Sequence, residues 1–381
     1  MGYGAQSAGT DTALARQYRA YFPVTARLVY MNHAGVAPLS KPAADAMKRF
    51  TEDALEFGAL HYDDWLATYE GLRAAAARLI GACPDEIAIV KNTSEGIATV
   101  ATGLDWRPGD RLVAFAEEFP ANYFPWKLLE SEGVRVAWLS VHDPLERIEQ
   151  ACRGARLLAI SFVQYLSGYR ADLEAIGKIC RRHDCLFFVD AIQGLGAFPL
   201  DVQRAGIDAL AADGHKWLLG PEGCGVLYVR RAIQEMVRPK EIGWTNFAGY
   251  TDYASRDTTL RADAGRYECG TLNTVGCFGL RASIEFLLSV GVGRIGDTLL
   301  RLTEHIAAGV KRKGYEVLPR GSAENGSGIV SFRREGVDSE TVVRALRRKG
   351  IVLAARQGWV RASPHFYISE DDVDRLLAEL P

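Results

Sequence analysis

The sequence predicts an α/β fold, with a large domain built on a mostly parallel β-sheet and a smaller C-terminal α+β domain. In the middle of the chain, short runs of apolar and β-branched residues alternate with helical patterns, which is typical of buried parallel strands covered by helices. After about residue 278 the pattern changes to long helices mixed with shorter strands. We therefore expect an N-terminal segment at 1–25, a large domain at 26–260 and a small domain at 261–381.

The individual elements follow from local patterns. Expected strands of the large domain lie at 86–90, 111–115, 134–140, 156–162, 185–190 and 223–229. Between them, residues 172–184 place Leu173, Ile176 and Ile179 on one helical face. In the last third we expect helices from about 278 and over 294–313, short strands near 315–318, 328–333 and 351–354, and a final helix within 369–380 that Ser369 caps.

Composition and charge narrow the class of partner. The chain has 381 residues, of which 48% are hydrophobic and 24% charged, and its formal net charge is −2. This balance gives no electrostatic attraction for nucleic acid or an anionic membrane, so we expect a small-molecule ligand instead. No apolar run approaches ~18 residues and no signal peptide is evident, so we expect a cytoplasmic protein without a membrane span.

The cysteines do not indicate disulfides. Seven of them are spread along the chain, an odd number that does not suit a disulfide framework. Cys180 and Cys185 flank His183 and would suit a metal clip. Because no second ligand pair stands nearby, we favour a helix end that turns into a strand, and we expect no metal site.

Two motifs place polar groups after apolar strands. Lys216 lies in AADGHKW, after a strand-like piece and before glycines that let the backbone approach a ligand. Asp190 ends the apolar run at 185–190, at the carboxyl end of a buried strand, where open α/β sheets bind ligands. A buried carboxylate needs a cation, such as a protonated pyridine nitrogen, and Gln193 can reach the same ligand. Taken alone, Lys216 could be a surface lysine and Asp190 a helix N-cap.

A third motif suits a phosphate. The strand at 86–90 ends shortly before Thr93 and Ser94, which open a helix. Helix N-termini offer free N–H groups and the positive end of the helix dipole, and the two hydroxyls add donors. A plain N-cap is equally consistent with this motif taken alone.

In this order, the helix start at Thr93, the pair Asp190 and Gln193, and the Gly-His-Lys ending at Lys216 resemble the fold-type I pyridoxal-phosphate (PLP) enzymes. The closer resemblance is to the class V aminotransferase family, which includes cysteine desulfurases, kynureninase and isopenicillin N epimerase. It extends from YMNHAGVAPLS at 30–40 to the final helix.

The resemblance implies roles around the cofactor. Lys216 would hold PLP as a Schiff base and then move the proton at the substrate Cα. Asp190 would keep the pyridine nitrogen protonated, and Gln193 would bond the phenolic oxygen. The phosphate would be held by Thr93, Ser94 and His215, and Phe119 would stack on the ring.

The resemblance also implies partners. Thr271, in YECGTLN at 267–273, would reach the phosphate in the other subunit of a homodimer with shared active sites. Arg361 would grip the carboxylate of an amino-acid substrate with its planar fork. Asn32 and His33, in the first loop, are further expected substrate contacts.

The sequence departs from the family at two places. A desulfurase needs a nucleophilic cysteine, yet the stretches at 353–363 and 319–328 contain none. Asp213 stands where the family often has a serine near the phosphate, so we expect it to turn away or to pair with a cation.

Several reactions stay open on these residues. Transamination or β-elimination (C–S lysis) comes first, amino-acid epimerisation and kynureninase-like cleavage are alternatives, and desulfuration comes below them. A non-catalytic PLP-binding module is the alternative of a different class. Aromatic residues at 123–126, 243–247 and 365–367 could line a pocket for a bulky side chain, but we favour core and dimer interface for them.

Overall fold

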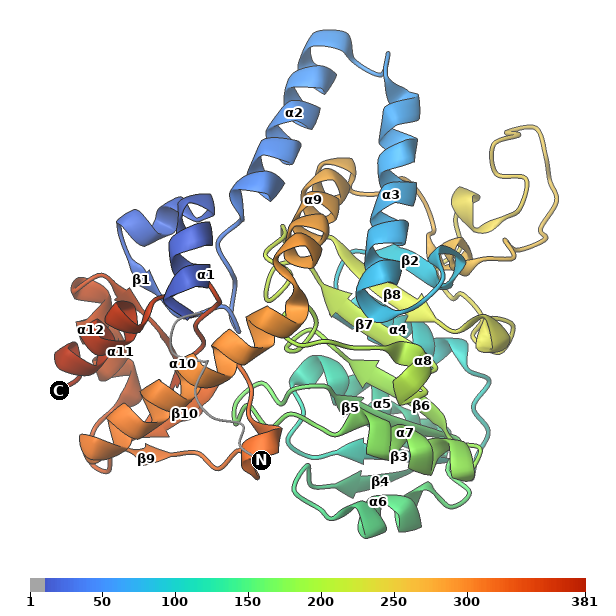
Figure 1. Cartoon of the computed structure of the whole chain (residues 1–381). Helices are drawn as coiled ribbons and strands as arrows, with labels where there is room; N and C mark the ends of the chain where they lie inside the picture. The colour runs from blue at the N-terminus through green and yellow to red at the C-terminus, as the bar shows by residue number, and fades with distance from the viewer. Residues whose placement is uncertain (1–10) are drawn as a thin grey trace, which may run out of the picture.

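The computed structural model describes residues 11–381, so residues 1–10 of the expected N-terminal segment lie outside the described part. Figure 1 shows a central sheet with helices packed against it and a smaller unit built by the C-terminal third. A hairpin of two long helices, α2 (Lys41–Phe57) and α3 (Tyr62–Ile80), projects away from the sheet. Helix α1 (Asp11–Tyr18) lies beside the smaller unit.

The central sheet has seven strands in the order β2-β8-β7-β6-β5-β3-β4. Their bounds are Ile87–Val90 for β2, Arg111–Phe115 for β3, Arg135–Leu139 for β4, Leu157–Ser161 for β5, Leu186–Asp190 for β6, Ala209–Asp213 for β7 and Gly225–Val229 for β8. The pairings of β3 to β7 are all parallel, whereas β8 runs antiparallel to β7 and β2. The predicted mostly parallel sheet is confirmed.

Alternating side chains of each strand fill two separate cores, because successive residues of a strand face opposite sides. Ile87 and Ile89 belong to the core beneath α3, α6 (Leu145–Cys152) and α7 (Leu173–Arg182). Ala88 and Val90 belong to the core beneath α4 (Thr93–Gly103) and α5 (Phe124–Leu128). The short helix α8 (Val202–Ala205) connects β6 to β7. Burial on both faces explains why these strands are almost wholly apolar.

The C-terminal third forms an antiparallel sheet of four strands, in the order β12-β13-β10-β9, with helices around it. The bounds are Glu316–Val317 for β9, Val330–Arg333 for β10, Ala354–Arg356 for β12 and Trp359–Ala362 for β13. The helices are α9 (Thr274–Val290), α10 (Val292–Arg312), α11 (Ser339–Arg348) and α12 (Glu370–Glu379). Ser369 caps α12 as predicted, since its side chain accepts from Asp372 N.

A short strand from the N-terminal part of the chain joins this smaller unit. Strand β1 (Val29–Tyr30) pairs in parallel with β11 (Ile351–Val352). Helix α9 begins at Thr274, a few residues before the expected start, because the Asn273 side chain caps it through Gly276 N. Since α9 packs against α2 and α3, contacts cross the expected boundary between 260 and 261. That boundary stays a prediction.

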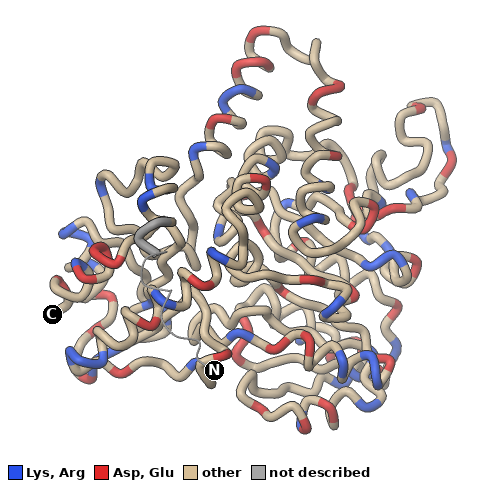
Figure 2. Tube along the Cα trace, in the orientation of Figure 1, with Lys and Arg blue, Asp and Glu red and all other residues tan. Residues whose placement is uncertain are grey.

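Charged residues of both signs are interspersed along the trace (Figure 2). Among the described residues, no single helix is long and apolar enough to cross a membrane. Helices α9 and α10, bent by 79° at their junction, meet that length and apolarity only when taken together.

Candidate active site

The polar residues singled out in the sequence converge at the carboxyl ends of β5, β6 and β7. Strand pairing sets Ser161 beside Asp190, and Asp190 beside Ala211. The carboxyl ends of these neighbouring strands therefore lie side by side. The loop after β7 brings Lys216 to this edge. Parallel strands ending side by side form the crevice in which α/β proteins bind ligands.

Asp190 is buried, and burial raises the pKa of its carboxyl to about 6. The backbone N–H of Ile192 bonds Oδ1 at 3.1 Å and, together with the charge of Lys216, opposes this rise. No hydrogen bond from the described residues reaches the other oxygen, Oδ2. The carboxylate therefore lacks the cationic partner that a buried charge requires, and a protonated ring nitrogen would supply it.

Lys216 faces the same crevice. Burial lowers the pKa of its ammonium to about 8, with Asp190 acting to raise it and Arg361 to lower it further. Its Nζ lies 5.6 Å from the centre of the Phe119 ring. Phe119 is 45% exposed although it is a large apolar side chain, so part of its ring is open to a ligand. These positions suit a flat ring held between Phe119 and the strand ends.

The start of α4 offers groups that suit an anion. Asn92 caps the helix, so the Thr93 hydroxyl is not needed as a cap. The Thr93 Oγ1 instead accepts from the backbone N–H of Asp213 at 2.9 Å, which leaves its own hydrogen to donate. Thr93 is buried, whereas Ser94 is exposed at the same helix end.

Asp213 and His215 lie beside this helix start. His215 Nδ1 is 3.1 Å from Asp213 Oδ2, an ion-pair distance without hydrogen-bond geometry, and this buried nitrogen has no hydrogen-bond partner. Asp213 Oδ1 accepts from Gly214 N at 2.7 Å. Asp213 Oδ2 thus lies beside the His215 imidazole, and the expected pairing of Asp213 with a cation stays a prediction.

Gln193 is buried and held from both ends of its amide. Its Nε2 donates to Ala34 O at 3.0 Å, and its Oε1 accepts from Trp217 Nε1 at 2.8 Å. Since an amide nitrogen has two hydrogens, one remains for a ligand. The indole next to Lys216 therefore fixes the orientation of Gln193.

Arg361 lies on β13 with only 2% of its surface exposed. Its Nη1 donates to Tyr165 O at 2.7 Å, while its buried Nε has no hydrogen-bond partner in the described part of the chain. Burial, and then the nearby charge of Arg356, lower the pKa of Arg361 to about 10. The edge formed by Nε and Nη2 is the one that binds a carboxylate with two parallel hydrogen bonds, and it is free here.

The two residues of the first loop differ. The Asn32 side chain lies over Gly35, and its buried Oδ1 has no partner. His33 is fully buried, with Nδ1 2.8 Å from Ser363 O and Nε2 2.6 Å from the Tyr367 hydroxyl. Burial lowers the pKa of His33 to about 4. Both ring nitrogens are thus engaged inside the protein, and the substrate contact of His33 stays a prediction.

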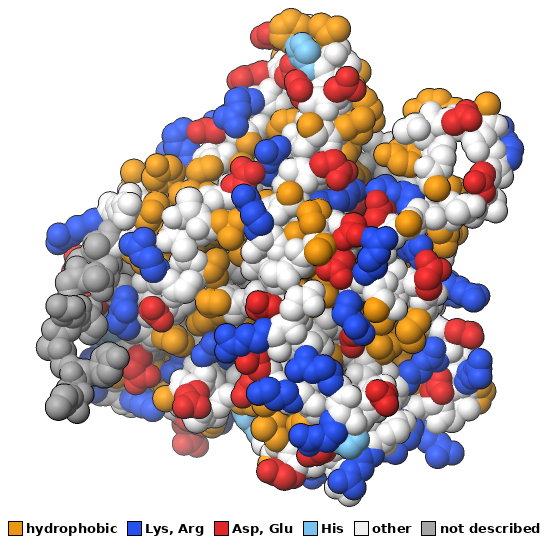
Figure 3. Space-filling view, turned by 45° about the vertical axis from the view of Figure 1, so that its right-hand side comes forward, with side chains coloured by type: hydrophobic (Ala, Val, Ile, Leu, Met, Phe, Trp, Pro, Cys, Tyr) orange, Lys and Arg blue, Asp and Glu red, His pale blue; other side chains and the backbone are white. Residues whose placement is uncertain are grey.

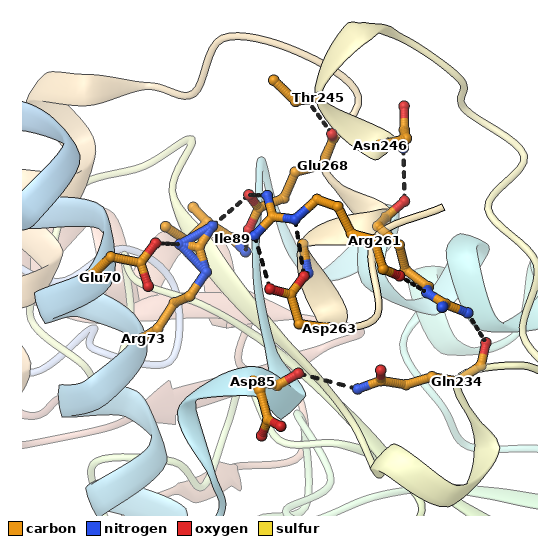
Figure 4. Close-up of polar contacts among 12 residues, drawn as sticks. Glu70, Arg73, Asp85, Ile89, Gln234, Thr245, Asn246, Arg261, Asp263 and Glu268 are labelled. Carbon is orange, nitrogen blue, oxygen red and sulfur yellow. Dashed lines mark hydrogen bonds and ion pairs between the residues drawn. The ribbon is translucent and has the colours of Figure 1, made fainter. Parts of the chain in front are cut away.

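Thr271 is exposed, and among the described residues no hydrogen bond or ion pair joins it to the group around Lys216. Glu268 holds the start of its segment, as Figure 4 shows. The buried Glu268 carboxylate accepts from Ile89 N at 2.7 Å and pairs with Arg73. Thr245 donates to the Glu268 backbone oxygen. This network anchors the loop that carries the exposed Thr271.

Comparison with known proteins identifies the family. The model of the family described as Aminotransferase class-V matches residues 29–376. The chain belongs to this family. A probable cysteine desulfurase of Methanothermobacter thermautotrophicus is 32% identical, over 91% of this chain and 92% of that protein.

Solved structures of a cysteine desulfurase and of a cystine C–S lyase share the fold. The apo structure of a cysteine desulfurase from Thermococcus onnurineus superimposes with a TM-score of 0.88 at 27% identity, covering 95% of this chain and 96% of the other. The cystine C–S lyase C-DES, in complex with its product cysteine persulfide, gives a TM-score of 0.87 at 25% identity, covering 94% and 98%. The chain is therefore a PLP-dependent enzyme of fold type I, as the sequence predicted.

The residues present fit the cofactor of class V enzymes. Among the described residues, Asp190 Oδ2 has no hydrogen-bond partner and the Thr93 hydroxyl hydrogen has no acceptor, and the Phe119 ring is partly exposed. Each of these groups matches a different part of PLP: the ring nitrogen, the phosphate and the ring surface.

The sequence did not predict three residues of this site, Glu118, Tyr165 and Gln357. Tyr165 lies edge-on to Phe119, with ring centres 5.3 Å apart, and its hydroxyl accepts from Gln357 Nε2 at 2.8 Å. Glu118 is buried next to Phe119 and bonds both the backbone N–H, at 2.6 Å, and the hydroxyl of Ser161. Burial raises the pKa of Glu118 to about 7. The only sequence signal was the acidic pair preceding Phe119, since Tyr165 and Gln357 lie in loops far from the motifs.

Proposed function

We propose that this chain catalyses β-elimination on a cysteine-type amino acid, cleaving the bond between Cβ and sulfur. When bound, PLP supplies a carbonyl that forms a Schiff base with an amine, and a protonated ring that accepts electrons from a bond at Cα. Asp190 Oδ2 would hold the ring nitrogen and Gln193 the phenolic oxygen. Thr93, Ser94 and His215 would hold the phosphate, and Phe119 would cover one face of the ring.

The substrate carboxylate would bind the free edge of Arg361. That edge is fixed because Tyr165 O holds the opposite side of the guanidinium at 2.7 Å. Asn32 offers its unpaired Oδ1 to the substrate ammonium from the first loop. With the carboxylate held, the bond that is to break is oriented at Cα rather than left to rotate.

Lys216 would transfer the proton. The low pKa of its ammonium means that a neutral amine is accessible near pH 7, so Nζ can remove the hydrogen from Cα. The electron pair of that bond forms a Cα–Cβ double bond, and the Cβ–S pair leaves with the sulfur as thiolate. Water then converts the released enamine into a keto acid and ammonia, so no oxidant or reductant is consumed.

The observation that favours elimination is the hairpin of β12 and β13 beside the site. It turns at Gln357, which adopts a φ of +48°, and Gln357 bonds Tyr165. Residues 353–363 contain no cysteine. A persulfide mechanism needs a protein thiolate that reaches the substrate sulfur, whereas elimination needs only the base and the carboxylate clamp.

The second candidate is cysteine desulfuration, because class V relatives with that name are similar over nearly the whole chain. Transamination, which the sequence placed level with elimination, uses the same base and clamp. The expected cytoplasmic location stays a prediction.

We also propose a homodimer with shared sites. Leu55 and Leu60, at the tip of the α2–α3 hairpin, are 83% and 73% exposed. Figure 3 shows hydrophobic side chains gathered on this projecting hairpin. The exposed Thr271 segment would complete the phosphate site of a second copy.

The test supplies L-cysteine, cystine and cysteine S-conjugates to the PLP-loaded protein without a keto-acid acceptor. Pyruvate and ammonia in equal amounts over many turnovers would support elimination. Alanine with enzyme-bound sulfane sulfur would establish desulfuration. A single turnover that resumes only after a keto acid is added would establish transamination. The Lys216→Ala variant, as control, should give no product.

A further inference from the structure

A cluster of three thiols lies near the amino-terminal end of β6, opposite the end that carries Asp190. Cys152 is the last residue of α6, Cys180 lies in α7, and Cys185 directly precedes β6. All three are buried, and their Sγ atoms lie within 4.8 Å of one another. The sequence argued against a metal clip at 180–185 because no further ligand stood nearby. The packing of α6 against α7 brings the missing third thiol.

The spacing of the sulfurs suits one shared ion. Metal–thiolate bonds are about 2.3 Å long, which places three sulfurs around an ion in their plane about 4 Å apart. The three Sγ atoms, at most 4.8 Å apart, need to move only slightly to reach this distance. Buried cysteines also pack as small apolar side chains, but such packing does not require three sulfurs from three separate elements to converge on one point.

The ligand set selects the kind of ion. The neighbouring carboxylate Asp208 is already bonded to Phe187 N at 2.8 Å and to Arg230 at 2.7 Å. His183 Nε2 is 3.2 Å from Glu149. No fourth ligand joins the three sulfurs among the described residues. Soft thiolates suit both zinc and monovalent copper, but zinc would need a water as its fourth ligand, so a set of three sulfurs favours monovalent copper.

We propose that Cys152, Cys180 and Cys185 bind one cuprous ion. A hollow of about 450 Å³ gives access, because Cys180 and Cys185 form part of its wall. Arg181 and Arg230 line the same hollow, and their charges would offset the negative charge of three thiolates.

The copper site is separate from the PLP site. Cys185 precedes β6 and Asp190 ends it, so the two residues are roughly 16 Å apart at the usual rise of a strand. The proposal therefore does not depend on which reaction Lys216 serves.

The test titrates the reduced, PLP-loaded protein with Cu(I) under anaerobic conditions, in competition with a chromophoric Cu(I) chelator. We expect one tightly bound ion per chain. The Cys152→Ser and Cys180→Ser variants should each weaken binding by about 100-fold or more, since even the loss of an outer-shell contact costs 10–100-fold. Cys224→Ser is the matched control, because Cys224 is equally buried and lies 4.0 Å from Cys277 in a separate pair.

The outcomes are distinct. Retained PLP absorbance and an unchanged melting temperature would show that each variant folds. Loss of the tight ion in the two cluster variants, with the control unchanged, would support the site. The proposal would be overturned by Cu(I) binding that Cys224→Ser abolishes, by zinc binding more tightly than Cu(I), or by no binding stronger than that of the chelator.

Discussion

The lowered pKa of Lys216 predicts how fast the apoenzyme recovers its cofactor as pH changes. Only the neutral amine attacks the PLP carbonyl. With a pKa of about 8 instead of 10.5, roughly a tenth of the amine is neutral at pH 7, about 300-fold more than for an ordinary lysine. The rate should therefore rise about tenfold between pH 7 and 9 and then level off. An unperturbed lysine would give about a hundredfold rise over that range without a plateau.

The assay mixes apoenzyme with PLP and follows the Schiff-base absorbance by stopped flow from pH 6 to 10. Charge variants supply the internal test. Asp190→Asn removes a charge that raises the pKa of Lys216, so the midpoint should move down. Arg361→Met removes a charge that lowers it, so the midpoint should move up. Arg147→Met, an exposed change on α6, should leave the profile unmoved. Shifts of the same sign in the first two variants, or a rate still rising at pH 10, would refute this account of the site.

Three further predictions use other parts of the structure. Arg361→Lys should lower kcat/KM by about 10–100-fold, since one charged hydrogen bond is worth ~1.5–3 kcal/mol. Arg356→Lys, the control, should change kcat/KM little. Equal effects of the two variants would contradict binding of the substrate carboxylate by Arg361. The Lys216→Ala and Thr271→Ala variants should each lose activity. Mixing them should restore it, because each hybrid dimer has one site in which both Lys216 and Thr271 are intact. Activity no higher than that of the separate variants would contradict the shared site. The pKa of His33 is lowered from 6.5 to about 4, so the folded protein binds this proton less readily than the unfolded chain. The free energy of unfolding should therefore fall by about 3 kcal/mol as pH drops from 6.5 to about 4. In denaturant unfolding, His33→Gln should show a weaker dependence of this free energy on pH, and an unchanged dependence would contradict this prediction.

The sequence predicted what local patterns encode. The seven strands are short apolar runs because both faces of the sheet are covered. Asp190 and Lys216 could be placed together because each follows a strand, and carboxyl ends of parallel strands share an edge. The Ser369 cap was predicted because capping depends on a few adjacent residues.

Contacts between distant segments left no such signal. The bond from Arg361 to Tyr165 O joins residues 196 positions apart, and Tyr165 stands in a loop without periodicity. The pairing of β1 with β11 joins two strands of two residues each, too short for alternation to be detected. The hydrogen bonds of His33 could not be predicted for the same reason, since its partners Ser363 and Tyr367 belong to the other end of the chain.

Strand β6 shows why the five buried cysteines of this chain do not argue for desulfuration. A thiol that attacks a substrate must lie at the carboxyl edge of the sheet, where Asp190 and Lys216 meet. Cys185 directly precedes the amino end of the same strand and belongs to the cluster of three thiols at that end. Cys224 and Cys277 are buried against each other, and the hairpin that flanks Arg361 presents Gln357 instead of a thiol. In the proposed elimination the sulfur is a leaving group on the substrate, and the proposed copper site uses the separate cluster of thiols.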